Sequence, residues 1–147
     1  MLNDRLLIRD ADLTDVNSIA ALITELGYPT ATEEMRSRFT AIANHADYKT
    51  LVAEIANEII GLAGMVKGVY YEHNGGYVRI LAFVINQNFR NRSVGKQLLK
   101  ACEEWAIAEG AKTILLNSGN RDERVPAHLF YKKMGYQVKS SGFVKTL

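Results

Sequence analysis

A basic segment rich in small residues precedes a predicted helix in the middle of the chain. Its members are Arg90, Asn91, Arg92, Ser93, Val94, Gly95 and Lys96. Free N–H groups and the helix dipole attract anions to a helix N-terminus, and small side chains let a phosphate approach the backbone. Arginine and lysine can add charge-assisted contacts. The alternative is a solvated basic loop, but basic residues there oppose the dipole, which favours anion binding.

The elements on either side of this segment would hold it in place. Tyr77 to Ile85 is predicted to be a strand, and its apolar second half indicates a central position with both faces covered. Ser93 to Glu109 is predicted to be an amphipathic helix that ends at Gly110. Cys102 lies on its apolar side, so we interpret it as a packing residue.

The remaining elements follow from periodicity, caps and turns. Further strands are predicted at Leu6–Arg9, Tyr48–Ile55, Ile59–Tyr71, Thr113–Leu116, Tyr136–Lys139 and Phe143–Leu147. Further helices are predicted after Asp12, after Thr32 and from Pro126 to Met134. Turns are expected at Asn57-Glu58 and at His73 to Gly76. A meander that feeds a crossover helix predicts a mixed α/β sheet.

Composition sets limits on the class of protein. With 147 residues, 48% of them apolar, one soluble domain spanning residues 1–147 is expected. A net charge of +2 argues against nucleic acid or a membrane as partner. The first residues lack the pattern of a signal peptide and no apolar run is long enough to span a membrane, so a cytoplasmic location is expected. A single cysteine excludes an internal disulfide and a thiolate zinc cluster, and no metal requirement is expected.

Two motifs resemble those of the GNAT superfamily of N-acetyltransferases. The family's pyrophosphate motif, Gln/Arg-x-x-Gly-x-Gly/Ala, corresponds to Arg90-Asn91-Arg92-Ser93-Val94-Gly95, with Ser93 in place of the first glycine. The second motif is Phe130-Tyr131-Lys132-Lys133-Met134-Gly135-Tyr136. The order of elements matches as well, so the resemblance covers the whole chain. It implies an α/β (α+β) fold with a mostly antiparallel sheet of six to seven strands, splayed at its centre and flanked by about four helices.

The resemblance also implies a cosubstrate, acetyl-CoA, and roles for particular residues. The backbone of Phe83, Val84 and Ile85 would contact the pantetheine arm, and residues 90–96 would hold the pyrophosphate. Tyr131 would be the general acid that protonates the departing thiolate. A phenol with a pKa of about 10 can hydrogen-bond or protonate a thiolate whose conjugate acid has a pKa of about 8.5. A core tyrosine beside Phe130 is the alternative.

Two positions depart from the family pattern. Ala82 occupies the place where many relatives carry an acidic general base. Arg124 stands where many carry a cofactor-binding asparagine, and Asn117 or Asn120 could substitute for it. His128, three residues before Tyr131, is a candidate base, although a surface or cap histidine is an alternative. Arg124 and Asn120 are therefore included among the expected cofactor-binding residues.

The acceptor is predicted to be the primary amine of a small molecule. In this fold the first two helices and the hairpin near residues 70–76 wall the acceptor pocket, so Tyr28, Tyr70, Tyr71 and Tyr77 are candidates to line it. The C-terminal part, including Ala127-His128-Leu129-Phe130-Tyr131, resembles the aminoalkylphosphonate acetyltransferase branch. A non-catalytic acyl-CoA-binding module and an acetyltransferase for protein N-termini or lysines are the alternatives. Homodimers are common in the family, but no residue here indicates one.

Overall fold

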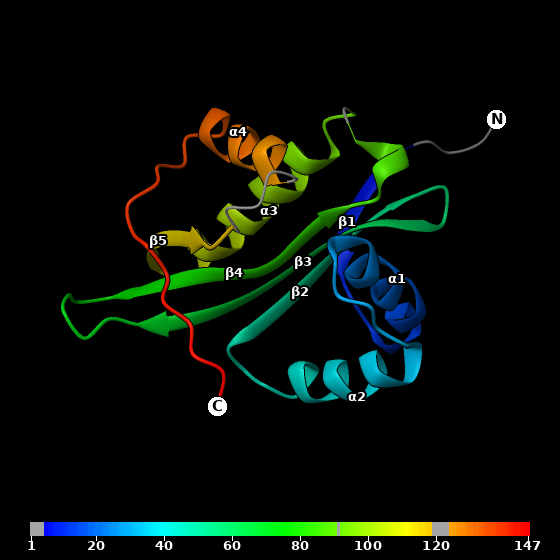
Figure 1. Ribbon diagram of the computed structural model, residues 1–147, viewed down its shortest axis with the longest axis horizontal. Helices are drawn as coiled ribbons and strands as arrows, with labels where there is room; N and C mark the ends of the chain where they lie inside the picture. Colours follow the sequence, from blue (N-terminus) through cyan, green and yellow to red (C-terminus); the bar gives the residue numbers. More distant parts are fainter. Residues whose placement is uncertain (1–4, 91, 119–123) are drawn as a thin grey trace. The chain divides into compact units, whose positions relative to one another are not determined.

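An antiparallel meander forms the centre of the sheet. The structure is a computed structural model that describes residues 5–90, 92–118 and 124–147. Strands β1 (Leu6–Asp10), β2 (Tyr48–Ile55), β3 (Glu58–Val69) and β4 (Gly76–Ile85) pair in chain order, each antiparallel to the next. The fifth strand, β5 (Ala111–Leu116), follows β4 in the order of the sheet (Figure 1). The chain divides into two compact units, residues 1–115 and 116–147.

The sheet has five strands, so the prediction of six to seven is wrong. The two predicted strands at Tyr136–Lys139 and Phe143–Leu147 are not formed, and residues 134–147 contain no helix or strand. Both predicted strands are short, and nearly all of their residues are exposed. A two-stranded hairpin is marginal without a sheet or helix to pack against, so a short apolar run is a weak signal.

A tight turn joins β2 to β3. Ala56 and Asn57 have positive φ angles of 52° and 66°. Two consecutive residues with positive φ are typical of the type I′ turn, whose twist matches that of the flanking strands. The turn therefore lies one residue before the predicted Asn57-Glu58 pair.

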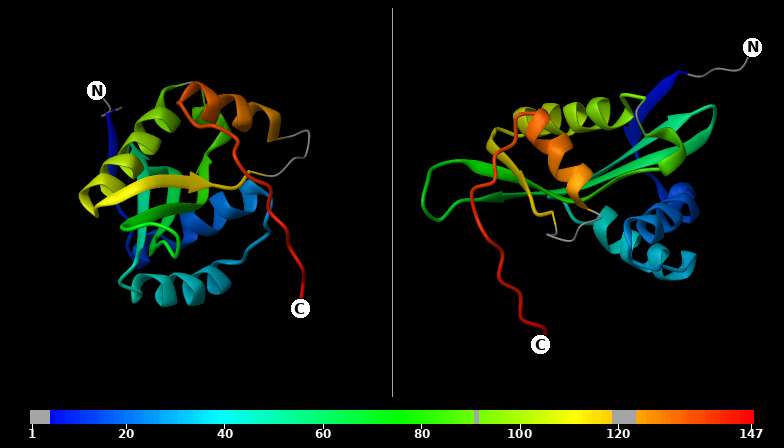
Figure 2. Two further views of the ribbon diagram at one scale, coloured as in Figure 1. Left: turned by 90° about the vertical axis from the view of Figure 1, so that its left-hand side faces the viewer. Right: turned by 45° about the horizontal axis from the view of Figure 1, so that its top comes forward.

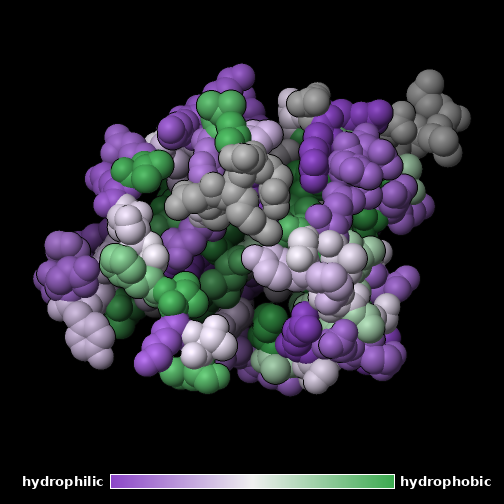
Figure 3. All heavy atoms as spheres, in the orientation of Figure 1, coloured by the Kyte–Doolittle hydropathy of each residue, from purple (hydrophilic) through white to green (hydrophobic). Residues whose placement is uncertain are grey.

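Helices cover both faces of the meander (Figure 2). On one face lie α1 (Val16–Leu26) and α2 (Thr32–Ala43), and on the other lies α3 (Val94–Ala108). A hydrophobic cluster on the first of these faces combines buried residues of α1, α2 and three strands: Val16, Ile19, Ala20, Leu22, Met35, Phe39, Val52, Leu62 and Val84. The outward residues of α2 are exposed and largely hydrophilic (Figure 3). Among the described helices, none is long and apolar enough to cross a membrane.

The buried side of α3 carries the single cysteine. Val94, Leu98, Leu99, Cys102 and Ala106 are buried, and Cys102 is fully so. Desolvation by burial, and next the negative charge of Glu103, raise the pKa of the Cys102 thiol to about 12. The thiol therefore stays protonated near neutral pH, which confirms its interpretation as a packing residue.

An ion-pair network ties the start of α1 to the sheet edge. Arg9 on β1 donates to both carboxylate oxygens of Asp15 at 2.9 Å and to Glu54 on β2 at 3.1 and 3.2 Å. Asp15 also accepts from the backbone N–H of Asp12 and completes a capping box. It lies in the 3₁₀ turn η1 (Leu13–Asp15), which leads into α1. The hydrogen bonds from Arg9 lower the pKa of the buried Asp15 carboxyl, and burial opposes this effect.

Candidate active site

The segment that joins β4 to α3 has an unusual backbone at Ser93. After a short 3₁₀ turn, η2 (Gln87–Phe89), the chain reaches Ser93, which has φ 63° and ψ 11° and is the N-cap of α3. This left-handed conformation suits glycine and is strained for other residues. Ser93 occupies the position of the motif's first glycine, so the structure gives a physical reason for the glycine found there in relatives.

Among the residues that the structure describes, no side chain caps the N-terminus of α3. Ser93 makes no capping hydrogen bond, and the first turn of α3 has no acidic residue. The first N–H groups of a helix have no partner within the helix, and the dipole gives this end a partial positive charge. The first turn of α3 can therefore accept an anion on its backbone.

Arg90 is anchored locally. Its Nε donates to the carbonyl of Ile85 at 3.2 Å, and its guanidinium lies 3.5 Å from the carboxylate of Glu25 on α1. Glu25 also accepts a hydrogen bond from the backbone N–H of Gln87 at 2.9 Å. In this arrangement Arg90 and Glu25 fix the path of the loop between β4 and α3.

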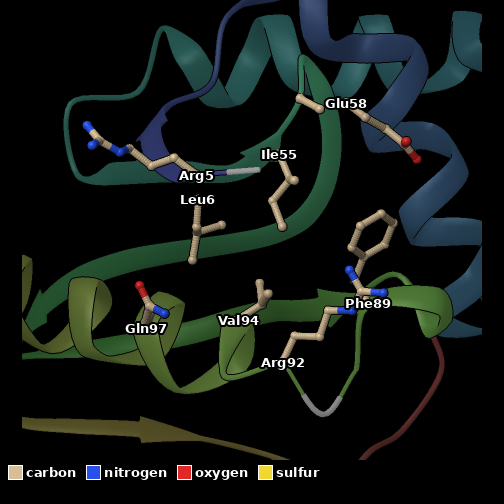
Figure 4. Close-up of a pocket in the computed structure, with 9 residues that line it drawn as sticks. Arg5, Leu6, Ile55, Glu58, Phe89, Arg92, Val94 and Gln97 are labelled. Carbon is tan, nitrogen blue, oxygen red and sulfur yellow. The ribbon is translucent and has the colours of Figure 1, made fainter. Parts of the chain in front are cut away.

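Arg92 faces a cavity beside the loop. Its guanidinium lies 5.3 Å from the centre of the Phe89 ring, a cation–π contact. Both residues line a cavity of about 570 Å³ together with residues of β1, the β2–β3 turn and α3 (Figure 4). Lys96 is exposed, with no hydrogen bond or ion pair among the described residues. Of the three basic side chains, Lys96 is therefore the one most available to an anion at the start of α3.

A β-bulge interrupts β4 next to the position where relatives carry an acid. Gly64 on β3 pairs with Ala82, and the next residue, Met65, pairs with Ile80, which leaves Leu81 as an extra residue on β4. Bulges redirect side chains and are frequent beside active sites. Ala82 is half-buried and Leu81 is exposed. At the end of β4, in contrast, the side chains of Val84 and Ile85 are buried in the core. Phe83 is half-buried.

Two of the four candidate tyrosines pack against each other. Tyr70 and Tyr77 form an aromatic pair with ring centres 5.2 Å apart, and His73 packs edge-on against Tyr70. The Tyr77 ring also covers Gly68, where an added Cβ would lie 2.7 Å from the ring. Tyr71 is fully exposed, and Tyr28 is exposed in the loop after α1.

The second unit carries Tyr131 and His128 on α4 (Val125–Lys133). Both are half-buried, and three residues along one helix place them on neighbouring turns. The Tyr131 ring packs against Phe130 at 5.2 Å and Tyr136 at 5.9 Å. Arg124 is the N-cap residue of this helix. Two of the predicted cofactor-binding residues, Asn91 and Asn120, lie outside the described residues.

Two residues near the site are not found by motif analysis. Glu25 gives no signal in the sequence, since its hydrogen bond joins positions 62 residues apart in the chain. Arg79 has a weak signal, as the one charged residue within the strand β4. The part of the chain that the structure describes contains no group of three or more histidine, cysteine or acidic residues suited to a metal ion.

Comparison with known proteins agrees with this arrangement. Residues 16–136 match the Acetyltransferase (GNAT) family, so the chain belongs to that family and is an N-acetyltransferase by class. It is 28% identical over 145 residues to the aminoalkylphosphonate N-acetyltransferase of Salmonella typhimurium, covering 95% of this chain and 90% of the relative.

Solved structures resemble the chain over nearly all of its length. A GNAT family acetyltransferase of Staphylococcus aureus subsp. aureus is 39% identical, with a TM-score of 0.84 and complete coverage of both chains. The aminoglycoside N-acetyltransferase AAC(6')-Iy in complex with CoA has a TM-score of 0.84 at 18% identity, covering 97% of this chain and 95% of its own, and indicates a shared fold alone. Enzymes of this family use acetyl-CoA as the acetyl donor.

Proposed function

We propose that residues 1–147 act as one domain that transfers an acetyl group from acetyl-CoA to a primary amine by direct attack in a ternary complex. The amine nitrogen bonds to the thioester carbon, and the C–S bond breaks. Sulfur receives a proton from Tyr131, and the proton that the amine loses passes to His128 or to water. The observation that carries the donor half of this proposal is the uncapped start of α3 after Ser93.

Acetyl-CoA binding would use the backbone more than side chains. The buried side chains of Val84 and Ile85 leave peptide groups as the means by which residues 83–85 could meet the pantetheine arm. The first turn of α3 would hold the pyrophosphate, with Lys96 as the adjacent cation and Arg92 as a second. Arg90 would position the loop through Glu25 and Ile85. Asn91, Asn120 and Arg124 remain proposed contacts from the family resemblance.

The splay at the centre of the sheet, which would open the groove for acetyl-CoA, stays a prediction. So does the role of the bulge, where a backbone N–H could polarise the acetyl carbonyl. Ala82 supplies no carboxylate, so His128 is the proposed base, since an imidazole can accept a proton. The acceptor would lie near Tyr70 and Tyr77, in keeping with the place of the acceptor pocket in the family. Tyr28 and Tyr71, both exposed, are further candidates to line this pocket.

Replacing Tyr131 by phenylalanine tests the chemical step. Turnover should fall at least about tenfold, because one positioned proton donor typically contributes roughly 100-fold or more. The Michaelis constant for acetyl-CoA should barely change, since the ring remains. Tyr136→Phe removes a hydroxyl from the neighbouring ring and is the matched control. Unchanged turnover of Tyr131→Phe on a confirmed amine would exclude this role.

A further inference from the structure

An arginine without a partner lies on the face of the sheet that α1 and α2 contact. Arg79 on β4 is half-buried, and among the described residues its guanidinium has no hydrogen bond or ion pair. Other arginines of the described chain are paired: Arg9 with Asp15 and Glu54, and Arg90 with Glu25. A guanidinium that is partly removed from water gains most from an oxyanion that it can bind in a bidentate manner.

The strand register places Arg79 on the same face as Gly64 and Ala82. Leu62 and Val84 pair directly and both belong to the core cluster of α1 and α2. Side chains alternate along a strand, so Gly64 and Ala82 lie on the same face, followed by Val66 and Arg79. On the neighbouring strand, Thr50 pairs with Gly64. We call this region the Gly64–Ala82 patch.

Two glycines of β3, Gly64 and Gly61, show how closely residues pack on the two faces of the sheet. Among the described residues, and apart from its chain neighbours, a Cβ added at Gly64 would meet one atom within 4 Å, the Cβ of Ala82 at 3.9 Å. At Gly61, on the opposite face, an added Cβ would lie 2.9 Å from Ile85 and 3.1 Å from Ala53. The two glycines therefore differ: Gly61 allows close packing, whereas the Cβ position of Gly64 is uncrowded by the described residues.

The three strands contribute one charged side chain, Arg79, to the Gly64–Ala82 patch. The residues that β2, β3 and β4 place on this face around Gly64 include no acidic side chain: they are Tyr48, Thr50, Gly64, Val66, Arg79 and Ala82. Arg79 and Ala82 pair with β3 residues two positions apart, so they are separated by roughly 7 Å along the sheet. This distance suits a compact molecule with one group at the bulge and another at Arg79.

We infer that Arg79 is a specificity-determining residue that binds an oxyanion on the acceptor, so that the preferred substrates are small primary amines bearing a phosphonate, phosphate or carboxylate a few bonds from the nitrogen. This inference rests on the proposed function, because it places the amine near the bulge, where the acetyl group would lie. Arg79 contributes to binding and takes no part in proton transfer.

Matched amines test this inference. Initial rates at saturating acetyl-CoA would be compared for 2-aminoethylphosphonate, β-alanine and propylamine, which have similar size but differ in the anion. At least one of the anionic amines should have a kcat/KM roughly tenfold or more above that of propylamine, since a hydrogen-bonded charge pair is worth about 10- to 100-fold. The favoured anion distinguishes a phosphonate site from a carboxylate site.

Variants of Arg79 then assign the preference to this side chain. Arg79→Gln should abolish the preference for anionic amines, mainly by raising KM for the anionic amine. It should leave kcat/KM for propylamine and KM for acetyl-CoA unchanged. Arg79→Lys should retain part of the preference. Lys49→Gln, which removes a positive charge from the other face of β2, should leave all three amines unchanged. Thermal unfolding checks that each variant folds. If Arg79→Gln does not fold, Arg79→Lys is the test: a partial loss of the anionic preference supports the inference, and an unchanged preference contradicts it.

The possible failures are distinguishable. The inference would be overturned if kcat/KM for propylamine equalled that for both anionic amines, or if Arg79→Gln kept the anionic preference. Either result would leave the proposed function intact. Failure to acetylate any amine, although acetyl-CoA protects the protein against thermal unfolding, would overturn both. Unchanged behaviour of Arg79→Gln cannot be explained by misfolding, so it counts directly against the inference.

Discussion

Glu25 at the end of α1 accepts a hydrogen bond from the backbone N–H of Gln87, at 2.9 Å, in the turn that follows β4. The same carboxylate lies 3.5 Å from Arg90. One side chain thus connects the first helix to the loop that would carry the pyrophosphate. The path of that loop depends on a residue that no motif includes.

Removal of this carboxylate should loosen the loop. We expect Glu25→Ala to raise the Michaelis constant for acetyl-CoA by about two- to fivefold and to lower the free energy of unfolding by about 1 kcal/mol, the usual contribution of a hydrogen bond. Steady-state kinetics and urea unfolding measure the two effects. Glu33→Ala, on the exposed outer side of α2, is the control and should change neither quantity.

Glycine, the residue of the family motif at position 93, should stabilise the fold more than serine does. Its left-handed backbone costs roughly 1–2 kcal/mol for a residue with a Cβ, whereas glycine loses about 0.5–1 kcal/mol in chain entropy. Ser93→Gly should therefore increase the free energy of unfolding slightly, by about 0.5 kcal/mol. Ser93→Val should decrease it. The control Lys100→Gly, within α3, should instead lower the free energy of unfolding by up to about 1 kcal/mol. Loss of stability in Ser93→Gly would argue against the left-handed backbone.

Lys96 should contribute directly to acetyl-CoA affinity. Because it is exposed and unpaired among the described residues, its ammonium group can approach a phosphate at the start of α3. Lys96→Gln should weaken acetyl-CoA binding roughly tenfold, as expected for loss of one charge-assisted hydrogen bond, and should reduce the salt dependence of binding. Lys100→Gln, one turn further along α3, should bind normally. Calorimetric titration with acetyl-CoA at two salt concentrations distinguishes the variants.

Asp15 should make stability depend on pH in the acid range. Arg9 lowers the pKa of Asp15 in the folded protein below its unfolded value. The ionised carboxylate therefore stabilises the fold above the unfolded pKa of about 3.9, and this contribution disappears as pH falls through the folded pKa. Asp15→Asn should cost roughly 1.5–3 kcal/mol at pH 7, since it weakens the charge-assisted hydrogen bonds from Arg9, which keeps Glu54 as its second partner. The difference from wild type should shrink below pH 4.

Urea unfolding at pH 7 and pH 3 measures this effect. Asp10→Asn removes another carboxylate that pairs with a cation, Lys49, but this carboxylate is exposed. Exposed pairs contribute little, so this variant should stay near wild type at both pH values. A constant deficit of Asp15→Asn from pH 7 to pH 3 would contradict the proposed linkage.

Local signals in the sequence predicted the elements that carry the loop. The apolar end of β4, the small residues after it and the amphipathic pattern of α3 are all encoded within one stretch of chain. The position of the bulge at Leu81 depends on how two strands align, which local signals do not specify. The same limit applies to Glu25 and Gln87, which are distant in sequence. The C-terminal strands failed for a related reason, because strand formation needs a partner that a short apolar run does not specify.

The burial of Cys102 has a practical consequence for the assays described above. With a pKa of about 12 and no exposed surface, the protein's single thiol should not react with colorimetric thiol reagents while the protein is folded. Coenzyme A released by the transfer can then be followed continuously with such a reagent, without background from the enzyme. A cysteine introduced on the surface would likewise be the only position to accept a fluorescent label.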